Sequence, residues 1–250
     1  MKFSKDTFAR AAGLRLAGLL VLAVAGPNCL QAQIMDDKVY WMAVADELEF
    51  APGLHERPVA FDGWFWIGGD FTRFWIRAEG EWATVGNESE MEAQFLYSRL
   101  IAPFWEAQAG IGLETVTGGG TTHTRGALVL GLEGLAPYWF HVEPQVLVSQ
   151  EGDISFALAA SYELLFTQRL VMKPGLGMAA AIQEVPEFGV GSGFNDLYLS
   201  ARLRYEIIRE IAPYVGVVWS RKFGATADLA RAANRETSEA FFVAGLRVWY

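Results

Sequence analysis

The chain has 250 residues, of which 52% are apolar and 14% aromatic, and it carries 20 basic against 29 acidic side chains. A formal charge of -9 argues against binding to nucleic acid, because a grip on phosphates needs clustered Lys and Arg. The apolar fraction excludes a disordered chain. We therefore expect one folded domain with no nucleic-acid partner.

Residues 1–32 have the features of an N-terminal signal peptide. Four basic residues precede the apolar run 16–25, which is about half the roughly 20 residues that a membrane-spanning helix needs. We expect cleavage after Ala32 and export of the remainder. The single cysteine, Cys29, would leave with the signal peptide, so the exported protein could use no disulfide.

Residues 33–63 are interpreted as a periplasmic arm ahead of the first strand. The arm carries Met35, Met42 and His55 among several carboxylates. Thioethers favour Cu(I), whereas nitrogen and oxygen donors favour Cu(II). The three residues are therefore tentative copper ligands.

Residues 64–250 alternate between apolar and polar side chains with a period of two. In residues 196–206, for example, the apolar residues Leu199, Ala201, Leu203 and Tyr205 alternate with Ser200, Arg202, Arg204 and Glu206. Ten such segments are predicted as strands: residues 73–82, 90–99, 104–114, 125–135, 138–149, 154–164, 169–182, 196–206, 212–222 and 240–250. The pattern indicates an all-β, antiparallel, up-and-down transmembrane β-barrel of about ten strands.

Alternation alone does not separate a barrel from a soluble sandwich, and three other features favour the barrel. Short corners at residues 101–105, 135–139 and 211–214 combine Pro with aromatic residues, as at a periplasmic rim. The other connections, at residues 115–124, 183–195 and 223–238, are expected to be long loops, and the last strand ends on Tyr250. Pro144 and Pro174 lie inside predicted strands, so we expect either bulges there or different strand boundaries.

The predicted interior is strongly charged. We expect a neutralising network that fills a narrow lumen, formed by Arg77, Glu79, Glu81, Glu92, Glu106, Arg202, Arg204 and Glu206. His141 and Glu143 face inward on one strand, near Glu133 on its neighbour, and form a second set of tentative copper ligands. His123 is interpreted as a solvated loop residue. No nucleophile motif stands out, so we name no catalytic residue and expect no enzyme.

Several ordered motifs together resemble the copper resistance protein B family. They are Gly63-Trp64, Gly68-Gly69-Asp70, Leu96-Tyr97-Ser98-Arg99, Ile101-Ala102-Pro103-Phe104-Trp105, Gly134-Leu135-Ala136-Pro137-Tyr138-Trp139-Phe140, Thr167-Gln168-Arg169-Leu170, Leu203-Arg204-Tyr205-Glu206-Ile207, Ile211-Ala212-Pro213-Tyr214, Arg221-Lys222-Phe223-Gly224 and Thr226-Ala227-Asp228. The resemblance covers about residues 60–250. The arm departs from the family because it lacks Met- and His-rich repeats, and His141 stands where relatives are expected to have an acidic residue.

The resemblance implies a copper resistance protein in the outer membrane of a Gram-negative bacterium. Such a protein would bind copper ions and contribute to copper homeostasis by sequestration or export, in contact with outer-membrane lipid and beside a periplasmic copper oxidase. Two alternatives stay open: an outer-membrane lipid hydrolase or acyltransferase, and a plugged barrel that acts only as a scaffold.

Overall fold

The computed structural model describes residues 38–53, 58–84 and 88–250. The predicted signal peptide, Met35 and His55 lie outside these ranges. The described residues all belong to one compact unit. Within the described residues, no helix has the length and apolar character needed to cross a membrane.

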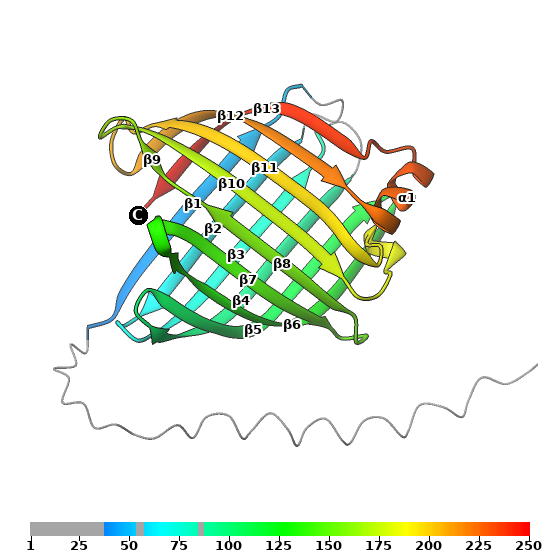
Figure 1. Ribbon diagram of the computed structural model, residues 1–250, viewed down its shortest axis with the longest axis horizontal. Coiled ribbons are helices and arrows are strands. Elements are labelled where there is room, and N and C mark those ends of the chain that lie inside the picture. Colours follow the sequence, from blue (N-terminus) through cyan, green and yellow to red (C-terminus); the bar gives the residue numbers. More distant parts are fainter. Residues whose placement is uncertain (1–37, 54–57, 85–87) are drawn as a thin grey trace, which may run out of the picture. The chain divides into compact units, whose positions relative to one another are not determined.

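The described chain is almost entirely β-structure, arranged as a closed barrel of strongly tilted strands (Figure 1). The strands are β1 (Tyr40–Phe50), β2 (Val59–Gly68), β3 (Thr72–Trp82), β4 (Ser89–Ala102), β5 (Trp105–Gly118), β6 (Thr121–Ala136), β7 (Phe140–Ser149), β8 (Ile154–Ser161), β9 (Leu164–Leu165), β10 (Leu170–Ala181), β11 (Gly193–Tyr205), β12 (Ile211–Lys222) and β13 (Ser238–Trp249). Two 3-10 turns, η1 (Pro137–Trp139) and η2 (Pro186–Phe188), and one helix, α1 (Gly224–Ala232), complete the described elements.

The barrel is antiparallel and up-and-down, and it has twelve strands rather than about ten. The order runs from β11 through β12, β13 and β1 to β10, and the pairing of β10 with β11 closes the ring. β8 and β9 both pair with the same edge of β10 and together make one broken strand, which gives the count of twelve. Closure leaves no unpaired strand edge.

The two additional strands, β1 and β2, lie where a periplasmic arm was expected, so the boundary at residue 63 is wrong. A bulge between Ala45 and Glu47 disrupts the alternation of β1. As a result, the consecutive side chains of Asp46 and Glu47 both reach cationic partners of the interior network: Lys173 and Arg247 contact Asp46, and Arg202 contacts Glu47. A period-two pattern cannot reveal such a strand.

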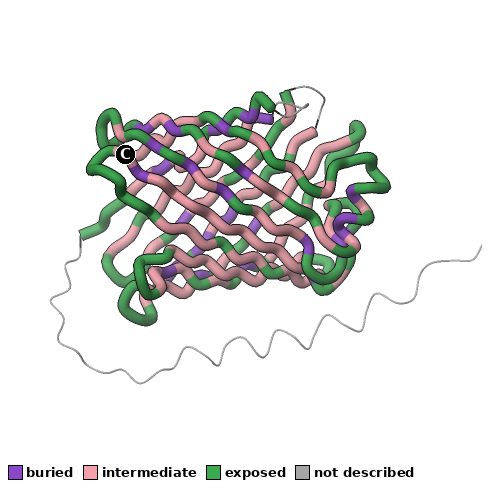
Figure 2. The backbone as a smooth tube through the Cα atoms, turned by 45° about the horizontal axis from the view of Figure 1, so that its top comes forward, coloured by how far each residue is buried: buried purple, intermediate pink, exposed green. Residues whose placement is uncertain are grey.

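Elsewhere the alternation predicts the two faces of the wall. On β11, Leu199 and Leu203 are exposed, whereas Arg202 and Arg204 are buried. Figure 2 shows that buried residues are scattered along the strands and that most residues of the wall are of intermediate burial or exposed. The molecule is therefore apolar on its outer surface and polar inside, the inverse of a soluble protein.

Bulky side chains fill part of the interior between β2 and β7. Trp75, Leu96 and Val129 form a buried cluster, against which Trp64, Trp66 and Leu147 pack. β10 instead carries Gly175 and Gly177, and a Cβ atom at Gly175 would lie 2.6 Å from Ser200 Oγ. Small residues on this strand leave space for the long charged side chains that cross the lumen.

The two rims of the barrel differ. The rim that holds Tyr40 and Tyr250, here called the terminal rim, has short turns and exposes Phe104, Tyr138 and Trp139, all with positive φ. The opposite rim, the loop rim, carries α1 and the 182–192 loop (Figure 1). The Pro-aromatic corners all lie at the terminal rim, as expected, although Ile211–Tyr214 already belong to β12.

Three local expectations fail. Residues 115–124 form no long loop, because β5 and β6 continue to a tight Gly119-Gly120 turn with φ of 60° and 81°. Neither Pro144 nor Pro174 creates a bulge. β8 and β9 are interrupted opposite Pro174, but they keep the same register on β10, because a missing N–H removes a ladder bond without inserting a residue.

Candidate metal centre

The candidate metal centre consists of Glu133, His141 and Glu143, near the terminal rim. Glu133 lies at the end of β6, and His141 and Glu143 lie at the start of β7, beyond the short η1 turn. Because side chains two residues apart share a face, His141 and Glu143 point the same way. The pairing of Gly134 with Val142 brings Glu133 beside Glu143.

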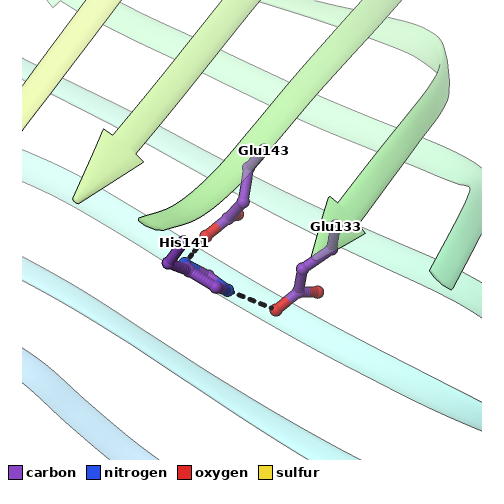
Figure 3. A group of neighbouring side chains, drawn as sticks. All are labelled: Glu133, His141 and Glu143. Atoms are coloured by element: carbon purple, nitrogen blue, oxygen red, sulfur yellow. Dashed lines mark hydrogen bonds and ion pairs between the residues drawn. The ribbon is translucent and has the colours of Figure 1, made fainter. Parts of the chain in front are cut away.

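The imidazole lies between the two carboxylates (Figure 3). His141 Nε2 is 3.2 Å from Glu133 Oε1, and His141 Nδ1 is 3.1 Å from Glu143 Oε1. One ligand atom from each residue can be chosen so that all three lie within 4.8 Å of one another. One nitrogen and two oxygen donors suit Cu(II) and other divalent transition metals better than Cu(I).

Arg77, on β3, contacts the same two carboxylates from inside the barrel. Its Nη2 donates to Glu133 Oε2 at 2.6 Å, and its Nη1 donates to Glu143 Oε2. Gln108 Nε2 also donates to Glu133 Oε2, at 2.6 Å. The cluster is thus a closed hydrogen-bonded network in which one guanidinium offsets part of the negative charge of the two carboxylates.

A row of carboxylates follows the interior across five strands. Glu47, Asp62, Glu79, Glu92 and Glu114 are successive cross-strand neighbours from β1 to β5, and we call them the acidic row. The row ends at Arg125, whose Nε lies 2.6 Å from Glu114. Like charges placed directly opposite one another repel, and the five carboxylates concentrate acidic groups along one side of the interior.

The remaining members of the predicted charge network form ion pairs or lie beside the acidic row. Arg73 and Ser98 bind Glu106, each at 2.7 Å. Arg202 binds Glu47 and Glu49, and Arg204 binds Glu163 and Glu206. Glu81 pairs in register with Glu90.

Two other predicted residues occupy unexpected places. Met42 is part of β1 and pairs with Trp66, so it belongs to the barrel wall and not to an arm. His123 lies in β6 and is half-buried, with its ring 6.3 Å from that of Phe188, which corrects its interpretation as a solvated loop residue.

Sequence reasoning brought His141, Glu143 and Glu133 together but missed Arg77 as their partner. The short turn that begins at Pro137 indicated that β6 and β7 pair as neighbouring antiparallel strands. In contrast, Arg77 lies 66 residues before Glu143, on a strand four positions away in the sheet. Only closure of the barrel places the two side chains in contact.

Comparison with known proteins identifies the family. Residues 39–250 match the family model described as copper resistance protein B precursor (CopB). Copper resistance protein B of Escherichia coli is 33% identical over 217 residues, which cover 87% of this chain and 72% of that protein. The copper resistance protein B homolog of Pseudomonas syringae pv. tomato is 35% identical over 218 residues, with the same two coverages.

Among solved structures, the KdgM porin is similar at 12% identity and a TM-score of 0.48, over 84% of this chain and 98% of the porin chain. The family model and the two relatives agree with each other, and the family model covers all twelve strands of the barrel. The chain belongs to the copper resistance protein B family.

Proposed function

We propose that this protein binds copper ions within an outer-membrane barrel and contributes to copper homeostasis by sequestration or export, without catalysing a reaction. Membership of a copper resistance family supports the choice of metal. The observation that carries the proposal is the convergence of Glu133, His141 and Glu143 inside the barrel, with ligand atoms within 4.8 Å.

The membrane location is part of the proposal and rests on the outer surface. Large apolar side chains such as Ile111, Val215 and Phe242 are exposed along the wall, by 57%, 61% and 72%. Exposed apolar area on this scale is unfavourable in water but favourable against acyl chains. Closure also satisfies the backbone hydrogen bonds, as a bilayer requires. We therefore include outer-membrane lipid among the proposed partners.

A periplasmic copper oxidase is a second proposed partner, and the family resemblance alone suggests it.

The acidic row supports the idea that cations enter the barrel. Glu79 of the row and the neighbouring pair Glu81 and Glu90 have inward positions on β3 and β4 yet stay accessible to solvent. Carboxylates lining a low-dielectric wall focus the field and raise the local concentration of cations. Copper ions would therefore be concentrated beside the candidate centre before they bind.

Copper titration of the refolded protein tests the binding site. We expect His141→Ala to weaken Cu(II) binding at least about tenfold, because it removes the single nitrogen donor of the centre. His123→Ala is the matched control, since His123 also faces the interior but lies outside the centre. Equal affinity of both variants and the wild type would reject this site. Replacing Met35, Met42 and His55 in turn then tests the other tentative ligands.

The closed network at Arg77 favours a second candidate, a plugged barrel that acts only as a scaffold and passes no ion. Copper flux into proteoliposomes separates the two. Flux above that of empty liposomes supports export, whereas bound copper without flux supports sequestration. The absence of both copper binding and copper flux would leave two interpretations, the scaffold and the outer-membrane lipid hydrolase or acyltransferase.

A further inference from the structure

All four carboxylate oxygens of the candidate centre are engaged. The two Oε1 atoms face His141, at 3.2 Å and 3.1 Å, and the two Oε2 atoms accept hydrogen bonds from Arg77. The fork of the guanidinium bridges Glu133 and Glu143 as a metal ion would. Arg77 therefore occupies the position of a cation between the two acids.

A divalent ion and this guanidinium cannot share the carboxylates favourably. Both are cations, and an ion bound to Glu133, His141 and Glu143 would lie within a few ångströms of Arg77 in a partly buried site, where screening is weak. Metal binding must then either displace Arg77 or overcome its repulsion.

The structure contains an alternative position for the displaced side chain. Glu79 lies two residues after Arg77 on the same face of β3, and Asp62 is its cross-strand neighbour on β2. Within the described ranges, neither Asp62 nor Glu79 has an ion-pair partner. The flexible Arg77 side chain can thus exchange one pair of carboxylates for another without losing charge compensation.

We infer that Arg77 is an internal competitor for the metal: it holds Glu133 and Glu143 together in the empty protein and moves toward Asp62 and Glu79 when a cation binds. This inference rests on the proposed function of the same centre. It makes Arg77 a positioning residue that sets the copper concentration at which the centre fills, and not a ligand.

Cu(II) titration of full-length refolded protein tests the inference with Arg77→Gln. We expect this variant to bind Cu(II) at least about tenfold more tightly than the wild type, because the competing charge is gone. Arg73→Gln is the matched control: Arg73 is an inward arginine of the same strand, but it pairs with Glu106. It should bind copper as the wild type does.

Two further measurements guard against a folding defect. Arg77→Lys keeps the charge but cannot bridge both acids, so it should bind with intermediate affinity. Free guanidinium ion should weaken copper binding to Arg77→Gln, by replacing the missing group, more than it weakens binding to the wild type. Tighter binding that guanidinium reverses supports the inference, and unchanged affinity of folded Arg77→Gln or Arg77→Lys overturns it.

The outcomes separate the inference from the proposed function. If the wild type binds copper through His141 and Arg77→Gln binds no more tightly, the inference falls and the proposed function stands. If only Arg77→Gln binds copper, and does so through His141, the inference is supported, and Arg77 prevents copper from binding at the centre of the wild-type protein. If neither protein binds, both are wrong.

Discussion

At the scale of single residues, cations that cross the lumen connect strands far apart in the sheet. Arg202 shows this best, because it is only 6% exposed and is hydrogen-bonded on every side. It donates to Glu49 at 2.5 Å and 3.1 Å, to Glu47 at 2.6 Å, to Tyr198 at 2.6 Å and to Ser200 at 2.8 Å. These bonds join β11 to β1, three positions along the sheet.

Arg202→Ala should destabilise the barrel by about 3–5 kcal/mol, because two glutamates would be left without their cation in a buried place. The measurement is the free energy of unfolding in urea with lipid or detergent present. Arg231→Ala is the control, since the Arg231 side chain is 62% exposed on α1 and pairs with the exposed Asp228, and its loss should cost no more than about 1 kcal/mol. Equal costs would show that the Arg202 network does not hold the barrel together.

At the scale of elements, the 182–192 loop and α1 lie together at the loop rim. Phe188 lies over Arg125, with the guanidinium carbon 4.3 Å from the ring centroid. The loop is fixed at its other end, where Gly191 N donates to Thr226 Oγ1 of α1 at 2.9 Å and Asn195 Nδ2 donates to Gly191 O at 2.9 Å. The loop therefore packs on Arg125, the cation that follows the acidic row.

Phe188→Ala should loosen this loop, because the cation–π contact contributes on the order of 1 kcal/mol. Amide hydrogen exchange of residues 182–192 should accelerate roughly fivefold, while exchange of β5 and β6 should not change. Phe194→Ala provides the comparison: Phe194 lies at the same rim but packs 5.1 Å from Phe223. Similar exchange in the two variants would argue against a specific role for Phe188.

At the scale of the whole molecule, the apolar outer wall and the charged interior depend on each other. Twelve strands enclose a lumen narrow enough for arginines on one strand to reach glutamates several strands away. Apolar side chains are then left on the outside, where only a lipid environment makes their exposure favourable.

A charge placed on this wall distinguishes a membrane barrel from a soluble one. Val217 is 47% exposed near the middle of β12, and Val217→Arg should cost about 2–4 kcal/mol of folding free energy in lipid bilayers. Ile182→Arg, at the loop rim just after β10, should cost no more than about 1 kcal/mol. If both substitutions cost less than about 0.5 kcal/mol, as at a water-exposed surface, the membrane assignment is wrong.

The sequence by itself determined the fold class, the faces of ten of the twelve strands and the family. These features are local: alternation has a period of two residues, and the Pro-aromatic corners and ordered motifs are each a few residues long. Even the pairing of His141 with Glu133 follows from one short turn. The sequence pattern did not reveal β1, because its bulge breaks the alternation of apolar and polar residues. It did not reveal β2, because tryptophans occupy inward positions where polar residues are expected.

Only the tertiary structure decided which charges meet. Arg77 bridges Glu133 and Glu143, and Arg202 reaches Glu47 and Glu49 more than 150 residues away, because the number and stagger of the strands set the distances across the lumen. The acidic row depends in the same way on the register between neighbouring strands. A slip of one residue between any two of these strands would break the row. Hence the chemistry of the interior belongs to the closed barrel and not to any single strand.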